Sequence, residues 1–158
     1  MTSNKSHLTA IGRKTLPVPT RWLLKNNLIK GKVLDYGCGR CHSLNNAHFD
    51  AHGFDPCWNF PQTDTSIVNN STYDTVICIY VLCVLEAKMR WDVLRNIQNN
   101  LNPNGIAYIA VRNDKPKNGW GVTSKGTYQG RVRKLTLPLL YKNSQFRIYT
   151  LTRNTELV

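Results

Sequence analysis

Short apolar runs alternate with polar and helical stretches along most of this chain. Val33 and Leu34 form a run that ends at Asp35, and residues 73–82 form a longer one that is almost continuously apolar and β-branched. Runs of this kind are typical of parallel strands that are covered on both faces. Weaker patterns predict further strands at residues 51–56, 63–69, 106–111 and 146–153.

Two longer stretches have the spacing of amphipathic helices. Residues 20–27 follow Pro19, and proline suits the first turn of a helix. Residues 88–100 repeat apolar side chains at helical spacing until an Asn-Pro-Asn-Gly sequence at 102–105 ends the pattern. Two shorter helices are predicted at residues 40–48 and 135–141.

The order of these elements predicts an α/β fold. A β-α-β-β-α-β succession favours a doubly wound, mostly parallel sheet of about six strands with right-handed crossovers. We expect one domain over residues 13–158, after a flexible polar N-terminus at 1–12. Residues 112–133 are polar, basic and glycine-containing, so they should form a loop over the strand ends, and 146–153 should be an edge strand.

Charge is distributed unevenly along the chain, which has 158 residues and a net charge of +12. Residues 1–32 hold seven Lys or Arg and no acid, residues 33–111 hold four basic and seven acidic residues, and residues 112–158 hold ten and two. Two basic ends that fold onto one rim would form a surface suited to a polyanion such as nucleic acid. The alternative is a solvated basic surface without a partner.

The five cysteines are expected to be reduced thiols, because nothing in the sequence indicates export. Residues 38–42 match the C-x-x-C-H pattern of covalent haem attachment, but they lie within a glycine turn and follow no signal segment. No second pair of ligands has zinc spacing, so we expect no metal. No apolar run is long enough to cross a membrane, and we expect a cytoplasmic protein.

Candidate chemistry begins at the turn after the first predicted strand. Gly37 and Gly39 let the backbone turn tightly and approach a ligand closely, and a helix beginning at Arg40 would present free amide groups to it. Asp55 ends the second predicted strand, twenty residues after Asp35. At that separation a βαβ unit places a carboxylate beside the ribose hydroxyls of a bound nucleoside.

This series resembles the class I S-adenosylmethionine-dependent methyltransferases, whose first strand ends in an acid followed by a Gly-x-Gly turn. Cys41 stands where a third glycine is common. The resemblance implies a Rossmann-like sheet of seven strands, and because only six are found here, the final hairpin should be trimmed. It also implies S-adenosylmethionine as the cofactor. The implied cofactor-binding residues are Asp35, Gly37, Gly39, Asp55, Pro56, Tyr80 and Val81, with Cys57 and Trp58 beside the adenine and Asp64 or Ser66 near its amine.

Within that family, the chain resembles the methyltransferases associated with DNA phosphorothioation. The likeness covers most of residues 13–130. It rests on Arg-Trp-Leu-Leu at 21–24, on residues 80–86, where Cys83 replaces a more usual asparagine, and on the glycine- and threonine-rich residues 119–129. The resemblance implies a connection with DNA.

The general base is the least defined role. No Asn-Pro-Pro-Tyr or Asp-Pro-Pro-Tyr sequence follows the fourth predicted strand, so the common signature of amino-methylating DNA enzymes is absent. Pro56-Cys57 follows the second strand, which is the wrong place for a cytosine-C5 nucleophile. Asp114 is the first candidate because it follows the fifth strand at the pocket rim, and Tyr80 should lie beneath the transferred methyl. The other candidates are Glu86, His42 and Tyr128.

Nucleic acid is the favoured acceptor, and DNA is favoured over RNA. Basic side chains suit phosphates, and aromatic ones suit stacking on an exposed base. The candidate contacts are Lys14, Arg21, Arg112, Trp120 and Tyr128. A chain of this size has no separate recognition domain, so selectivity should be low or supplied by a protein partner.

Other functions fit parts of the same pattern. One is a methyltransferase for a small metabolite, and another is a non-catalytic S-adenosylmethionine-binding module or a subunit of a larger assembly. A dinucleotide dehydrogenase is disfavoured, because its fingerprint has a later glycine that the turn at residues 37–42 lacks.

Overall fold

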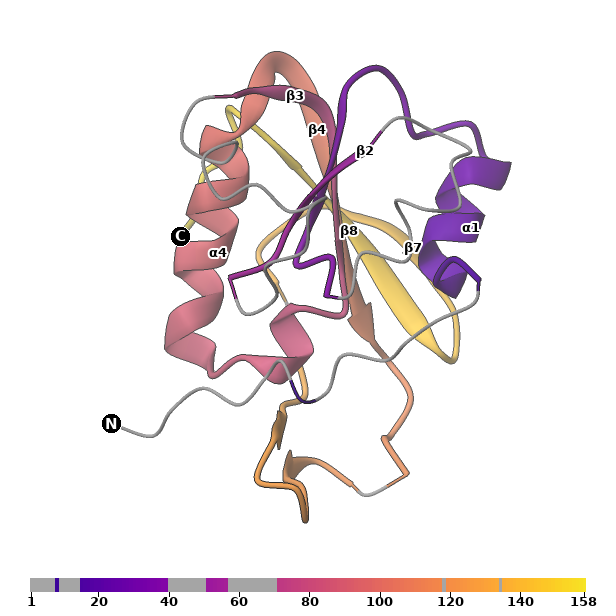
Figure 1. Cartoon of the computed structure of the whole chain (residues 1–158), viewed down its shortest axis with the longest axis vertical. Coiled ribbons are helices and arrows are strands. Elements are labelled where there is room, and N and C mark those ends of the chain that lie inside the picture. Colours follow the sequence, from indigo (N-terminus) through magenta and orange to yellow (C-terminus); the bar gives the residue numbers. More distant parts are fainter. Residues whose placement is uncertain (1–7, 9–14, 40–50, 57–70, 118, 134) are drawn as a thin grey trace.

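A six-stranded sheet forms the centre of the fold (Figure 1). The computed structural model describes residues 8, 15–39, 51–56, 71–117, 119–133 and 135–158. The strand order is β2-β1-β3-β4-β8-β7. Strands β1 to β4 are mutually parallel, and β8 runs antiparallel to both β4 and β7. The strands are β1 Val33–Tyr36, β2 Ala51–Phe54, β3 Tyr73–Ile79, β4 Leu101–Arg112, β7 Leu139–Lys142 and β8 Phe146–Thr152.

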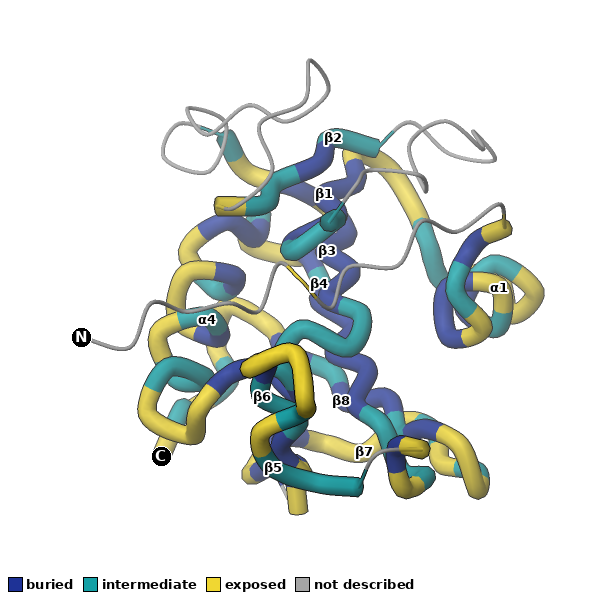
Figure 2. The backbone as a smooth tube through the Cα atoms, turned by 60° about the horizontal axis from the view of Figure 1, so that its bottom comes forward, coloured by how far each residue is buried: buried dark blue, intermediate teal, exposed yellow. Residues whose placement is uncertain are grey.

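The two faces of the sheet are covered by helices on opposite sides, α4 (Ala87–Asn99) on one and α1 (Val18–Lys25) on the other (Figure 1). Successive residues of a strand point to opposite faces. In β4, Ile109 belongs to the buried cluster that contains Leu94 of α4, whereas Tyr108 belongs to the cluster that contains Leu23 of α1. Figure 2 shows that burial is concentrated in the central strands. The apolar runs of the sequence therefore mark strands that are covered twice.

The strand register brings the two acidic strand tips to the same edge of the sheet. Asp35 of β1 pairs with Gly53 of β2, and Asp55 follows β2 directly. On its other side, Asp35 pairs with Ile77 of β3. Because these strands are parallel, the turns that follow all three lie at one carboxyl edge, which is where ligands bind in open α/β sheets.

Most of the predicted elements are confirmed, within a few residues, where the structure describes them. Strands appear at the positions predicted from 51–56, 73–82 and 106–111, and helices α1 and α4 correspond to 20–27 and 88–100. The predicted strand at 63–69, the helix at 40–48 and most of the flexible N-terminus lie outside the described residues.

The prediction of a helix at residues 135–141 is wrong, because this segment runs alongside β8 and supplies strand β7. The carbonyl of Pro138 accepts a hydrogen bond from Thr150 N at 3.0 Å, so the proline that disfavours a helix is accommodated at the start of a strand. It follows that β8 lies between β4 and β7 rather than at the edge. The final hairpin, expected to be trimmed, is formed by β7 and β8.

A short helix and a short hairpin lie at the carboxyl edge of the sheet. The 3₁₀ helix η2 (Leu82–Val84) follows β3, and strands β5 (Gly121–Val122) and β6 (Tyr128–Gln129) pair within residues 113–133, hereafter the basic loop. The predicted loop is therefore present and contains a small hairpin. Among the described residues, no helix is long and apolar enough to cross a membrane.

Candidate cofactor and acceptor site

The turn after β1 depends on its glycines. Gly37 and Gly39 have φ values of +78° and +58°, a region that side chains with a Cβ rarely adopt. The backbone amides of Gly37 and Cys38 both donate to the carbonyl of Phe54, at 2.7 and 3.1 Å, which ties the turn to the end of β2. A Cβ at Gly37 would overlap the Cγ2 methyl of Val81. Position 37 thus requires glycine for two reasons, its backbone conformation and the closeness of the Val81 side chain.

The two predicted acids occupy different environments at this edge. Asp35 is buried, with 6% of its surface exposed, and its charge adds to burial in raising the pKa of the Cys78 thiol. Asp55 is only half-buried, and its Oδ2 accepts a hydrogen bond from Gly39 N at 2.9 Å. Pro56, which follows, is exposed. The Asp55 carboxylate therefore also holds the glycine turn in shape.

Tyr80 has an unusual backbone conformation immediately after β3. Its φ is +64°, which is rare for a bulky residue, and its amide donates to the carbonyl of Ala110 in β4 at 2.9 Å. This change of direction ends the strand at Ile79, before the predicted limit of residue 82, and brings Val81 against Gly37. Such strain is found preferentially at functional sites. The structure thus brings together the turns after β1 and β3, as the sequence predicts.

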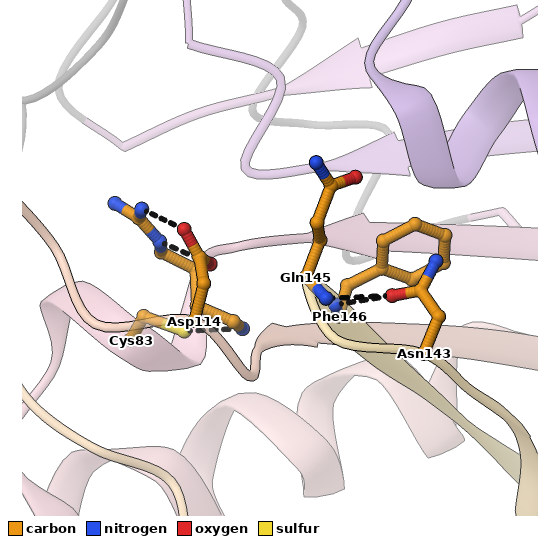
Figure 3. Close-up of polar contacts among 6 residues, drawn as sticks. Cys83, Asp114, Asn143, Gln145 and Phe146 are labelled. Atoms are coloured by element: carbon orange, nitrogen blue, oxygen red, sulfur yellow. Dashed lines mark hydrogen bonds and ion pairs between the residues drawn. The ribbon is translucent and has the colours of Figure 1, made fainter.

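Asp114, the first candidate for a general base, is held by an arginine (Figure 3). The Nε of Arg112 donates to Asp114 Oδ1 at 3.1 Å, and its Nη2 donates to Oδ2 at 2.7 Å. This bidentate contact lowers the pKa of Asp114 and raises that of Arg112. A carboxylate with a lowered pKa is a weaker proton acceptor. The same ion pair engages the Arg112 guanidinium, which the sequence suggested for a phosphate.

Cys83 of η2 closes the base of the basic loop. Its Sγ accepts a hydrogen bond from Arg112 N at 3.2 Å, and its carbonyl accepts one from Gly130 N at 2.6 Å. Residues 112 and 130 enclose the β5–β6 hairpin, so both ends of that segment are fixed to one residue. Burial raises the pKa of the Cys83 thiol, although the Arg112 amide and nearby guanidinium groups oppose this effect. We interpret Cys83 as a structural contact rather than a nucleophile.

A second set of contacts fixes the loop to the β7–β8 turn. The amides of Asn113 and Asp114 donate to the carbonyl of Gln145, at 2.8 and 3.3 Å. Figure 3 shows Asn143 facing the backbone amides of Gln145 and Phe146. Each of these amides donates a hydrogen bond to Asn143 Oδ1 at 2.8 Å. The last hairpin of the fold therefore supports the start of the loop.

Two arginines and one cysteine form contacts at this edge that were not anticipated from the sequence. The Nε of Arg90, on α4, donates to the carbonyls of Leu82 and Leu85 at 2.9 and 3.1 Å, and so holds η2. Arg147 of β8 donates to the carbonyls of Val132 and Arg133 at the end of the loop. These two arginines and Cys83 bind backbone atoms, which carry no sequence signal. The hairpin itself had a detectable signal, since Gly occurs in the short polar segment between two strand-like dipeptides.

The predicted substrate contacts are only partly brought together. Trp120 and Tyr128 are half-buried within the basic loop, and Arg112 is the last residue of β4, directly before it. Arg21 is exposed on α1, which covers a face of the sheet rather than its carboxyl edge. Glu86 is exposed, and its Oε2 forms an ion pair with Lys88 Nζ at 3.6 Å. The remaining candidates, Lys14, Cys41, His42, Cys57, Trp58, Asp64 and Ser66, lie outside the described residues.

A comparison with known families matches the chain to a family described as methyltransferase domain, over residues 13–153. The chain belongs to this family. A comparison with curated proteins gave no match. The family assignment agrees with the glycine turn and the sheet order described above.

Solved structures share the fold of this methyltransferase domain. A TehB-like SAM-dependent methyltransferase from Corynebacterium glutamicum is 20% identical, with a TM-score of 0.50, and the match covers 83% of this chain and 85% of that one. A DhpI–SAH complex is 8% identical, with a TM-score of 0.53 and coverages of 82% and 80%. A structure from echinomycin biosynthesis is 20% identical, with a TM-score of 0.49; the match covers 64% of this chain, which spans only 51% of that one.

Membership of the methyltransferase family implies S-adenosylmethionine as the cofactor. The described residues fit such a group, because a glycine turn with two positive φ angles lies between a buried carboxylate, Asp35, and a half-buried one, Asp55. In the described residues, no group of three His, Cys, Asp or Glu side chains could hold a metal ion. The individual roles of the cofactor-binding residues remain predictions.

Proposed function

We propose that this methyltransferase domain transfers a methyl group from S-adenosylmethionine to nucleic acid, and to DNA in preference to RNA. The cofactor supplies a methyl group on a sulfonium, which is activated for direct displacement. The protein then has to hold the acceptor in line with that methyl group. In our proposal, Asp35 and Asp55 bind opposite ends of the cofactor, and the turn at Tyr80 and Val81 lies below the transferred group.

The observation that carries the choice of acceptor is the charge of the basic loop. Residues 115–155 contain nine Lys or Arg and no acid. Five of these cations are exposed on the loop that leaves the carboxyl end of β4: Lys115, Lys117, Lys125, Arg131 and Arg133. Exposed cations beside the acceptor side of the site suit a phosphate backbone. A neutral metabolite would gain nothing from them.

The acceptor side favours a group that already has a free lone pair. Asp114 is the first candidate base in our proposal, but Arg112 lowers its pKa and so weakens it as a proton acceptor. A displacement by a ring nitrogen needs no proton to be removed before attack. We therefore assign Tyr80 and Asp114 to positioning the acceptor, and we do not require either of them to act as a strong base.

DNA is preferred over RNA because of the resemblance of residues 80–86 and 119–129 to the methyltransferases associated with DNA phosphorothioation. These are the segments that contain η2 and the β5–β6 hairpin. A base within a duplex has to leave the stack before it can be methylated, unless it is met in a single strand.

The test is transfer of a labelled methyl group from S-adenosylmethionine to DNA, RNA and a nucleic-acid-free cell extract in parallel. We expect label in DNA, less in RNA, and none in the extract. Asp35→Ala should abolish transfer, and Asp74→Ala, which removes an exposed acid from the start of β3, should not. Label found only in small molecules of the extract would support the metabolite alternative. Binding of S-adenosylhomocysteine without any transfer would support the non-catalytic module.

A further inference from the structure

The β5–β6 hairpin combines an exposed apolar side chain with a cation at the tip of the basic loop. Val122 has 75% of its surface exposed, although it lies in a strand. Lys125 is exposed in the connection between the two strands. Figure 1 shows this segment, in orange, projecting below the strands of the central sheet. Exposed apolar residues that occur singly are common on protein surfaces, so what matters here is the place of Val122 beside a cation on a projecting hairpin.

The connection between the strands has a fixed shape. The amide of Thr123 donates to the carbonyl of Thr127 at 2.7 Å, and the amide of Gly126 donates to the carbonyl of Thr123 at 2.9 Å. The hydroxyl groups of Thr123 and Thr127 also share a hydrogen bond, and Gly126 has a φ of +71°. The tip therefore presents Val122 and Lys125 in a defined arrangement.

The base of the hairpin is also fixed, relative to the catalytic edge. Cys83 binds both Arg112 N and Gly130 N, and β6 packs on η2, which begins one residue after Val81. Val122 pairs across the hairpin with Tyr128. A Cβ at Gly130 would overlap the Tyr128 ring and approach Arg90 Nη2 at 2.7 Å, so this glycine leaves room for the tyrosine to fold back. A rigid projection is thereby held at the edge where the acceptor must enter.

Nucleic acid satisfies both properties of the tip, because it combines a polyanionic backbone with an apolar stack of bases. Proteins that distort a duplex insert apolar side chains between base steps and place cations on the neighbouring phosphates.

We propose that the hairpin Gly121–Gln129 is a wedge that enters duplex nucleic acid. Val122 takes up stacking contacts next to the base that is displaced toward the methyl donor, and Lys125 contacts a flanking phosphate. This inference rests on the proposed function. It implies that methyl transfer to duplexes depends on Val122, whereas transfer to single strands does not.

The test compares Val122→Thr, which keeps the shape but adds a hydroxyl, with Val18→Thr, a matched change at an exposed valine of α1. The probes are a pool of random-sequence 30-base-pair duplexes and the corresponding single strands. We expect Val122→Thr to lower methyl transfer to duplexes by about tenfold, because the added hydroxyl weakens the apolar contact that offsets the cost of unstacking a base, and to change transfer to single strands by less than about twofold. Val18→Thr should change neither.

The outcomes separate the wedge from the proposed function. If Val122→Thr lowers transfer to duplexes and single strands equally, or to neither, the wedge is wrong while nucleic-acid methylation stands. If the unmodified protein labels neither form, both proposals fail.

Discussion

At the scale of single residues, the site depends most on a glycine. Gly37 has a φ of +78°, and a Cβ there would overlap Val81. Gly119 is a matched control, because its φ is +76° and a Cβ there would meet only Lys115 Cε at 4.0 Å. The two positions share the backbone cost of a substitution, which is about 1–2 kcal/mol for a left-handed residue. They differ in the contact with the turn after β3.

We therefore predict that Gly37→Ala weakens binding of S-adenosylhomocysteine by at least about tenfold, or about 1.4 kcal/mol. Gly119→Ala should lower stability by a similar backbone term and leave this affinity within about twofold. Isothermal titration calorimetry and thermal unfolding of both variants measure the two effects separately. Equal affinities of the two variants would show that the Gly37–Val81 approach does not shape the cofactor site.

The ion pair of Asp114 with Arg112 leads to a prediction about pH. The pKa of Asp114 is lowered in the folded protein, so the carboxylate stabilises the fold above its unfolded pKa of about 3.9. This stabilisation is lost as the pH falls through the lower, folded value. Asp114→Asn should therefore have a lower Tm than the unmodified protein at pH 7, and the difference should shrink below about pH 4.

Asp92→Asn is the control for this measurement, since Asp92 is exposed and lies 3.7 Å from Arg95 on the surface of α4. Exposed pairs of this kind contribute little. A Tm difference for Asp114→Asn that stays constant from pH 7 to pH 3 would show that its carboxylate is not the source of the stabilisation.

At the scale of elements, η2 is held by one arginine of α4. Arg90→Lys removes the Nε–H that binds the carbonyls of Leu82 and Leu85, and a lysine has no equivalent donor in that position. We predict that the free energy of unfolding falls by about 1–3 kcal/mol, as expected for hydrogen bonds from a charged group. Arg95→Lys, at an exposed position of the same helix, should change it by less than about 0.5 kcal/mol. Chemical denaturation measures both, and equal effects would contradict the role of Arg90.

The sequence predicted the central elements better than the peripheral ones. Residues 75–78 and 107–111 are buried on both faces, so their apolar pattern alone identifies them as strands. Residues 139–142 form a strand only because β8 lies beside them, and their own pattern was read as a helix. Tertiary pairing overrides local preference most easily at a sheet edge.

The site was predictable to a similar extent. Acids and glycines at strand ends identified the edge of the sheet that we propose for the cofactor, because the conformation of Gly37 restricts the residue type directly. The pairing of Arg112 with Asp114 was not predicted. The sequence suggested a phosphate contact for Arg112 and a general base for Asp114, whereas the two side chains form an ion pair with each other. The Cys83 contacts also escaped notice, because they join backbone groups of distant segments.

At the scale of the whole molecule, the arrangement of charge predicts how binding responds to salt. Each cation that neutralises a phosphate of a duplex contributes about 0.9 to the slope of log K against log salt concentration. The double variant Lys117→Gln, Lys125→Gln removes two exposed cations of the basic loop. We predict that it lowers the magnitude of the slope for duplex DNA by about two and weakens binding at all sequences alike.

The matched variant Lys25→Gln, Lys30→Gln has the same net charge but loses cations from the end of α1 and from the segment that precedes β1. Lys30 N bonds to Thr75 Oγ1 at 3.0 Å, which places it near the amino end of β3, opposite the edge that holds the basic loop. Fluorescence anisotropy of a labelled duplex between about 50 and 200 mM salt, the range over which phosphate contacts change affinity most visibly, gives both slopes. Equal losses of slope in the two variants would mean that net charge alone attracts the DNA. A loss confined to the loop variant would locate the DNA over the carboxyl edge of the sheet, next to Tyr80 and Val81, where we propose that methyl transfer occurs.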